Sequence, residues 1–269
     1  MPEGHTLHRL ARLHHKRYAG HPVEVSSPQG RFAAGASLVD GHVLRRAEAH
    51  GKHLLHVYDT DLVVHVHLGL YGSFSDVELP TTPPVGQVRM RVVGPTHWAD
   101  LRGPTRCEVI TDAEVKALRA RLGPDPLRRD ADPERAWNRV SKSRTPLAVL
   151  LMDQTVLAGV GNVYRAEVLF RHGVHPTLPG AKVDHALWTD IWTDLVALMR
   201  TGVRRNRIDT VRDEHLPKAM GRAPRQDRHG GEVYVYRRAG MPCLVCGTEV
   251  RTEVLASRNN YWCPTCQPE

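Results

Sequence analysis

Four cysteines near the end of the chain have the spacing of a metal site. Cys243 and Cys246 are separated by two residues, as are Cys263 and Cys266, and sixteen residues lie between the pairs. Each pair can place two thiolates about one turn apart, and two such pairs complete the tetrahedral coordination that Zn2+ adopts. Four thiolates leave no open position, so the spacing predicts one structural zinc. Two redox pairs, or unrelated thiols, are the alternative interpretation.

The first residues of the chain could supply a nucleophile. If Met1 is removed, which is usual before a small residue, Pro2 presents a secondary amine. An α-amine has a pKa of roughly 7.7–8 against roughly 10.4 for lysine, and the start of a helix lowers its pKa further. Such an amine can attack an aldehydic sugar carbon to form an iminium, and Glu3 beside it could move the proton.

The overall composition indicates a folded, basic protein. The 269 residues include 37 Lys and Arg against 29 Asp and Glu, giving a net charge of +8, which favours a polyanionic partner. No apolar run is long enough to span a membrane, and the first residues lack the pattern of a signal peptide. We therefore expect a cytoplasmic protein with no membrane partner. Cys107 is left over from the two pairs and is expected to be a small buried residue.

The first part of the chain predicts one helix followed by strands. Apolar residues recur at helical spacing from Leu7 to Tyr18 and stop at Gly20. Alternation over residues 62–68 puts Val64 on one face and His65 on the other, and Arg89 and Arg91 alternate with apolar residues over 88–92. This alternation predicts a sandwich or barrel with one buried face.

The second part predicts helices and then irregular chain. Residues 123–133 are rich in Pro, Asp and Arg and mark a boundary. Helices are expected over 145–155, with Thr145 as N-cap, over 162–171, and over an amphipathic stretch that ends just before Gly202. Residues 203–238 contain ten Lys and Arg against five Asp and Glu, and residues 233–236 alternate Val with Tyr.

A ribbon is expected between the cysteine pairs. Residues 258–262 mark two strands with a polar turn, and Arg258 at its tip suits contact with a phosphate. An ordinary solvated arginine is the alternative. The sequence thus predicts a multidomain α and β protein. A β-sandwich or barrel with a flanking helix and the candidate nucleophile covers 1–122, a helical domain covers 134–228, and a C-terminal β-ribbon zinc finger covers 231–269.

Three groups of residues resemble one family along essentially the whole chain. They are Met1-Pro2-Glu3-Gly4 with residues 51–55 and 67–72, then residues 152–167, and finally residues 257–267. These segments are similar to the N-terminal domain, the helix–two-turn–helix and the zinc finger of the formamidopyrimidine-DNA glycosylase and endonuclease VIII family.

The resemblance implies a role for individual residues in base-excision repair. Pro2 would attack C1′ of the damaged nucleotide, and Glu3 would donate a proton at the sugar. Lys52 and Arg258 match residues that contact the DNA backbone and assist β- and δ-elimination. His67 and Asn162 match phosphate contacts of the family. Leu70 and Tyr71 match side chains that fill the gap left by the flipped nucleotide.

Each of these assignments has a simpler alternative. Lys52 could be a solvated strand residue, Asn162 an N-cap, and Leu70 a core residue. His65 and His67 could suggest a metal pair, but no carboxylate completes the spacing in sequence, so phosphate binding or packing is favoured.

The pattern is most similar to the actinobacterial branch of endonuclease VIII-like proteins, which implies oxidised pyrimidines as substrates. Leu70-Tyr71-Gly72 replaces the Met-Ser-Gly of the 8-oxoguanine enzymes, and Ala148 replaces a lysine. Two departures are His5-Thr6 in place of Pro-Glu, and Gly69 in place of a glutamine. One fewer gap-filling side chain predicts comparatively good activity on single-stranded lesions.

We expect the protein to be a monomeric, bifunctional DNA glycosylase and lyase that binds damaged DNA. Duplex DNA is the expected form, and single-stranded DNA is an open alternative. Rival hypotheses are a non-catalytic protein of the same fold that binds damaged or single-stranded DNA, and a glycosylase specific for 8-oxoguanine and formamidopyrimidine. A metallohydrolase built on the histidines is a third.

Overall fold

A computed structural model describes residues 2–227 and 231–269. The chain divides into two compact units, Met1–Arg121 and Leu122–Glu269, here named unit 1 and unit 2. Among the described residues, no helix combines the length and the apolar character that a membrane span requires.

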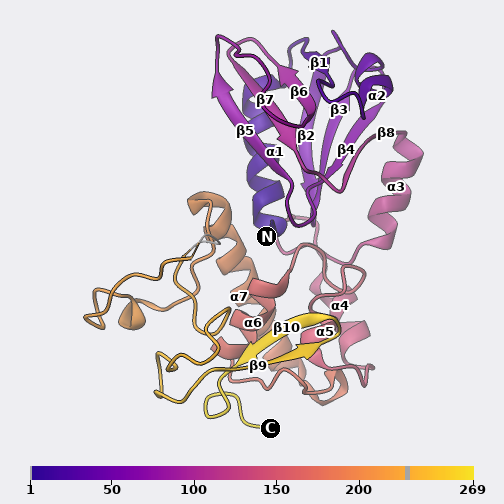
Figure 1. Cartoon of the computed structure of the whole chain (residues 1–269). Coiled ribbons are helices and arrows are strands. Elements are labelled where there is room, and N and C mark those ends of the chain that lie inside the picture. The colour runs from indigo at the N-terminus through magenta and orange to yellow at the C-terminus, as the bar shows by residue number, and fades with distance from the viewer. Residues whose placement is uncertain (1, 228–230) are drawn as a thin grey trace. The chain divides into compact units, whose positions relative to one another are not determined.

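Unit 1 is a two-sheet sandwich with helices at its edges (Figure 1). One antiparallel sheet has the order β1-β6-β7-β5 and the other the order β2-β3-β4-β8. The helices are α1 (Gly4–Tyr18), α2 (Ala33–Ser37) and α3 (Asp112–Arg121), and the strands are β1 (Glu24–Ser26), β2 (Leu44–His50), β3 (His53–Tyr58), β4 (Val63–His67), β5 (Ser73–Glu78), β6 (Val88–Val93), β7 (His97–Arg102) and β8 (Arg106–Ile110).

The expected alternation is present in β4, but the prediction of one buried face is wrong for its sheet. Val64 and Val66 join the main core between the sheets, together with Leu7 of α1. On the other face Val63 packs in a second cluster with Val115 of α3. The helix α3, which follows β8, therefore covers a surface that alternation alone assigned to solvent.

Arg91 is a second departure, because it is buried although its position predicts a solvent-facing side chain. Its guanidinium donates to both carboxylate oxygens of Asp100, at 2.6 and 2.8 Å, and Asp100 is fully buried. Such a pair offsets the cost of burying each charge alone. Cys107 is half-buried against the main core, and burial raises the pKa of its thiol to about 12.

A polar network fixes α1 to both sheets. The His14 ring bonds His56 of β3 at 2.9 Å and Asp76 of β5 at 3.3 Å. Asp76 also accepts from the Tyr18 hydroxyl at 3.2 Å and pairs with Arg17 at 3.0 Å. Burial alone would raise the pKa of Asp76, but the bonds from His14 and Arg17 outweigh it and lower that pKa.

Unit 2 combines helices with a zinc-finger hairpin, and its helices differ in length from those predicted. They are α4 (Pro133–Val140), α5 (Leu147–Leu150), α6 (Asn162–Arg171) and α7 (His185–Arg205), with 3-10 turns η1 (Gly180–Lys182) and η2 (Asp213–His215), and the hairpin is β9 (Arg251–Leu255) with β10 (Arg258–Trp262). The helix from Asn162 to Arg171 is confirmed.

Two predicted helix ends are wrong for local reasons. The helix expected over 145–155 is only α5, because Asp153 and Gln154 turn their side chains onto nearby backbone groups. Asp153 accepts from the Thr155 amide at 2.8 Å, and Gln154 bonds the Val160 carbonyl and the Gly159 amide. The long helix α7 passes through Gly202 and ends at Asn206, whose φ of 56° makes it the left-handed cap.

Acid is expected to destabilise unit 1 through its buried histidines. Burial, and then His14, hold the pKa of His56 well below its ordinary value, so the folded unit keeps His56 neutral where the unfolded chain binds a proton. The contribution of His56 to the free energy of unfolding is therefore full at high pH and is lost as the pH falls below the unfolded pKa of about 6.5. The loss from this group is about 2 kcal/mol at about pH 5. Hydrogen exchange of β3 and β4 amides at about pH 7.5 and about pH 5 measures the loss.

The variant His56→Gln should lose correspondingly less stability on acidification, whatever its stability at high pH. His42→Gln is the matched control, because His42 is exposed and pairs with Asp59 at 3.1 Å. An equal acid loss in His56→Gln and the wild type would contradict the assignment.

Candidate active site

The first residues lie at the head of α1. Glu3 precedes the helix in an extended conformation, and its carbonyl oxygen accepts the Thr6 amide at 2.9 Å. Its side chain is fully buried, while Pro2 is half-buried. Pro2 and Glu3 therefore lie at the positive end of a helix of 15 residues, which favours the neutral form of an amine there.

His5 follows in the first turn as a neutral group. It is buried, and its pKa is lowered to about 4, chiefly by burial and further by His8. No acidic residue occupies the first turn of α1. The second carboxylate that the resemblance leads us to expect is thus replaced by Thr6, and the neighbouring His5 is an uncharged imidazole near neutral pH.

Lys52 and His67 lie at one end of the β2-β3-β4-β8 sheet. Lys52 is half-buried in the tight turn between β2 and β3, where Gly51 has a φ of 57°. The next residue, His53, pairs with His67 at the end of β4, which brings that strand end beside the turn. Lys52 also contributes to lowering the pKa of His67, after burial and His65. A lysine and a histidine at one strand end can both donate to a phosphate.

The hydrogen bonds of His67 indicate which ring nitrogen carries its proton. Its Nδ1 accepts from the Gly69 amide at 3.1 Å, and burial keeps the ring neutral by lowering its pKa. A neutral ring that accepts at Nδ1 carries its proton on Nε2. His67 can therefore donate a hydrogen bond from Nε2 to an oxygen anion without being charged.

His65 belongs to a hydrogen-bonded chain rather than to a metal pair with His67. Its Nδ1 bonds Glu108 of β8 at 3.0 Å and its Nε2 bonds His53 at 2.8 Å. No carboxylate completes a metal-ligand spacing with His65 and His67 along the sequence, but the pairing of β4 with β8 puts Glu108 opposite His65. Over the described part of the chain, the only group of side chains arranged to hold a metal is the four cysteines.

Leu70 and Tyr71 are exposed on the loop after β4. Their exposed fractions are 47% and 87%, so the alternative that Leu70 is a core residue is wrong, and Leu68 takes that place. Gly69 has a φ of 67°, and a Cβ there would lie 1.8 Å from the Thr105 hydroxyl oxygen. A larger residue at 69 would strain this loop, so Leu70 and Tyr71 are its large exposed side chains.

In unit 2, Asn162 joins α6 to the hairpin. It is the first residue of the helix, with Gly161 as the N-cap residue, so the N-cap interpretation of Asn162 is wrong. Its side-chain amide donates to the Asn259 carbonyl at 3.0 Å, and buried Arg165 donates to the same carbonyl at 3.1 Å. Arg258, exposed at the start of β10, is thereby attached through its neighbour to the start of α6.

Glu167 organises the chain that leads to the zinc finger. Its buried carboxylate accepts from the amides of Tyr234, Val235 and Tyr236 at 2.6 to 2.8 Å, and from the Thr210 hydroxyl at 2.5 Å. The backbone of residues 234–236 therefore wraps around the Glu167 carboxylate. The sequence showed Glu167 only as part of the family motif, because its partners lie more than forty residues away.

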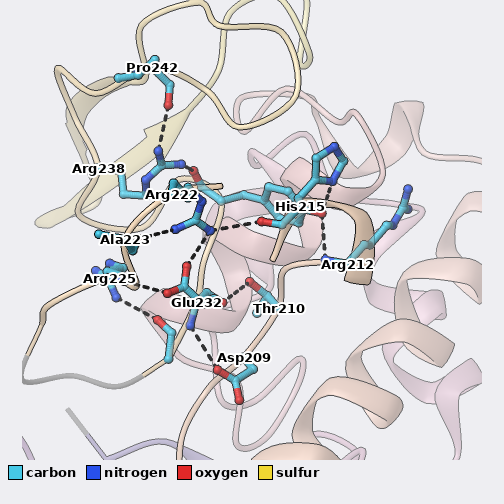
Figure 2. A network of polar contacts seen from close by, with 12 residues as sticks. Asp209, Thr210, Arg212, His215, Arg222, Ala223, Arg225, Glu232, Arg238 and Pro242 are labelled. Carbon is cyan, nitrogen blue, oxygen red and sulfur yellow. Dashed lines mark hydrogen bonds and ion pairs between the residues drawn. The ribbon is translucent and has the colours of Figure 1, made fainter. Parts of the chain in front are cut away.

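Several arginines of residues 203–238, here named the basic tract, bond to other groups of unit 2. Figure 2 shows Glu232 at the centre: its carboxylate accepts from the Arg222 guanidinium at 2.6 Å and from the Arg225 amide at 2.7 Å. Its own amide donates to Asp209 at 3.1 Å, and Arg238 donates to the Pro242 carbonyl at 2.8 Å. The excess of arginine over 203–238 thus stabilises irregular chain, and does not simply line a DNA surface. Residues 228–230 of the tract lie outside the described residues.

The four cysteines fit one zinc ion. One ligand atom from each of them lies within 4.8 Å of all the others, and the Cys243–Cys266 and Cys246–Cys263 sulfur distances are 3.9 and 3.4 Å. Thiolates about 2.3 Å from a tetrahedral zinc are separated by similar distances. Cys243 and Cys263 also belong to the core of unit 2, so the metal site and the helical core are continuous.

Three family models match consecutive parts of the chain. The formamidopyrimidine-DNA glycosylase N-terminal domain matches residues 1–107, the H2TH domain of that family residues 122–213, and the zinc finger found in FPG and IleRS residues 240–268. The chain therefore belongs to the formamidopyrimidine-DNA glycosylase and endonuclease VIII family.

Individual relatives agree with this assignment. Endonuclease 8 1 of Mycobacterium tuberculosis is 58% identical over 99% of this chain and 100% of its own. A probable endonuclease 8 2 of Streptomyces coelicolor is 33% identical over 99% and 94%. A Lactococcus lactis formamidopyrimidine-DNA glycosylase bound to DNA with an abasic site has the same fold, with a TM-score of 0.78 and 20% identity over 99% and 100%.

The residues expected from the sequence fall into two sets. Unit 1 contains Pro2, Glu3, Lys52, His67, Leu70 and Tyr71, and unit 2 contains Asn162, Arg258 and the zinc ligands. Within unit 1 the phosphate-binding candidates share one sheet end, and within unit 2 Asn162 and Arg258 are linked through Asn259.

Zinc removal is expected to loosen the hairpin and the start of α6, because the ligands form part of the same core and Asn259 bonds Asn162. Metal analysis should give one zinc per chain. After chelation, hydrogen exchange should accelerate in β9, β10 and the first turn of α6, while β3 and β4 of unit 1 act as the internal control. Unchanged protection of the hairpin after complete loss of zinc would contradict a structural role.

Proposed function

We propose that this chain is a bifunctional DNA glycosylase and lyase of base-excision repair that removes oxidised pyrimidines through a Schiff base at Pro2. One observation carries the proposal: Pro2 lies beside the fully buried Glu3 at the head of α1, in a chain 58% identical to an endonuclease 8. We expect the protein to act as a monomer in the cytoplasm.

The chemistry begins once Met1 has been removed. The neutral Pro2 amine attacks C1′ of the damaged nucleotide, the bond from C1′ to the base breaks, and the base leaves with a proton. The ring opens when Glu3 donates a proton to the sugar oxygen, giving an iminium between Pro2 and C1′. Loss of a C2′ proton then expels the 3′ phosphate, and a second elimination expels the 5′ phosphate.

Cationic and hydrogen-bond-donating side chains hold the phosphates on which these eliminations depend. Lys52 and His67 are the expected contacts from unit 1, and Asn162 and Arg258 those from unit 2. A protonated lysine or arginine beside a departing phosphate stabilises the charge that develops on its oxygens. Leu70 and Tyr71, being exposed and apolar, replace the stacking lost when the nucleotide is turned out of the helix.

Covalent trapping tests the nucleophile. Borohydride should reduce the iminium and link the intact zinc protein to DNA that contains an abasic site or an oxidised pyrimidine. Pro2→Gly, whose primary amine is less suited to forming the iminium, should reduce trapping at least about tenfold. Intact mass must show that Met1 is absent from both proteins. Complete absence of trapping by the processed wild type on all these substrates would favour a non-catalytic DNA-binding protein.

A panel of lesions tests the substrate class. Thymine glycol, dihydrouracil and 5-hydroxyuracil should be removed faster than 8-oxoguanine, and a preference for 8-oxoguanine would overturn the choice of pyrimidines. Because Gly69 contributes no side chain to the stack, single-stranded and duplex forms of one lesion should react at rates within about threefold. Strict dependence on duplex DNA would contradict that part of the proposal.

A further inference from the structure

Apart from His67, the residues that line one pocket of unit 1 have no role in the mechanism above. The volume of this pocket is about 580 Å3, and it lies between the end of the β3-β4-β8 sheet and α3. His53, His65, His67, Arg106, Glu108 and Arg121 are among its lining residues. Because His67 forms part of the wall, the pocket adjoins the sheet end where Lys52 is found.

Two arginines give the pocket its positive charge. Arg121 is exposed at the last position of α3, and among the ion pairs formed within the described residues it takes part in none. Arg106 is exposed at the start of β8 and pairs with Glu108 at 3.4 Å. At least one guanidinium therefore faces this pocket without a carboxylate.

The order of hydrogen bonds in the pocket wall leaves one nitrogen without a proton. Glu108 as a carboxylate only accepts, so His65 Nδ1 must donate to it. A neutral His65 then accepts at Nε2 from His53 Nδ1, at 2.8 Å. The Nε2 of a neutral His53 is consequently a bare acceptor, and uptake of one proton converts it into a donor.

We propose that this pocket is a second phosphate subsite, which holds a DNA phosphodiester beside the one at Lys52 and His67, and that its occupation is coupled to uptake of one proton by the His53–His65 pair. The inference rests on the proposed function, because it takes DNA to be the partner. The rings of His53 and His67 lie 5.0 Å apart, so one strand can follow both. Arg121 supplies the fixed charge, and the histidine pair supplies a charge that appears on binding.

The surroundings of His53 fix the direction of the pH effect. Burial lowers the pKa of His53 to about 3, with further lowering by His65, His67, Arg121 and His50. Lys52 and Arg106 add positive charge nearby, whereas Glu108 and Glu114 of the pocket wall oppose it. The empty pocket is therefore neutral at its histidines, and an anion there raises the pKa of the pair. Affinity should accordingly increase as the pH falls.

The test is a double-mutant cycle on DNA affinity, in which one change is made in the protein and the other in the DNA. Duplexes with a tetrahydrofuran abasic analogue carry a single methylphosphonate, which removes one phosphate charge, at successive positions flanking the lesion. One position should weaken wild-type binding about threefold to tenfold while weakening Arg121→Gln clearly less. Arg121→Gln should also lower the slope of log affinity against log salt by about one.

Arg45→Gln is the matched control, because Arg45 pairs with Asp61 at the opposite end of the same sheet. Its cycle should show no coupling at any phosphate. Absence of coupling for Arg121→Gln at every position would overturn the subsite. If inorganic phosphate alone, in place of DNA, distinguishes the wild type from Arg121→Gln equally well, the pocket takes free phosphate and its assignment to DNA is wrong.

Calorimetry in two buffers of different ionisation enthalpy tests the proton uptake. At about pH 6 the wild type should take up more protons on binding DNA than His53→Gln, and His42→Gln should match the wild type. Equal uptake by all three proteins would overturn the coupling. Borohydride trapping of the wild type on an abasic duplex, measured alongside, reports failure of the glycosylase proposal separately from failure of the subsite.

Discussion

The buried face of α1 is the constraint on which the chemistry of this chain depends. The first residues of a domain usually fray, yet the nucleophile proposed at Pro2 must stay fixed relative to Glu3. Leu7, Ala11 and Tyr18 pack in the core between the two sheets, and His14 ties the middle of the helix to β3 and β5. Glu3 is buried at the start of this helix, so Pro2 lies at the end of an element that is fixed by packing and hydrogen bonds.

Carboxylates perform the corresponding task in unit 2, where much of the chain between α7 and the hairpin is irregular. Glu167 satisfies three successive backbone amides, and Glu232 ties Arg222 and the Arg225 amide together. Backbone groups that have no sheet or helix partner must find other acceptors. Arg222 and Arg238 bond to groups within unit 2, so part of the positive charge of residues 203–238 is used internally.

Local signals in the sequence were sufficient for much of this architecture. The helix from Asn162 to Arg171, the alternation in β4 and the cysteine spacing all depend on residues close together in the chain. Local signals failed for Arg91, which alternation alone places toward solvent, because the pairing of β6 with β7 puts Asp100 opposite it. The chain from His53 through His65 to Glu108 was hidden for the same reason, since strand pairing alone brings Glu108 opposite His65.

The proposed chemistry depends on which amine forms the covalent bond to C1′ of the sugar. Peptide mapping of the borohydride-reduced adduct, after digestion of protein and DNA, locates the bond directly. We expect the sugar remnant on the amine of the peptide that begins with Pro2. A remnant on the side chain of Lys52, with an unmodified Pro2, would contradict this expectation.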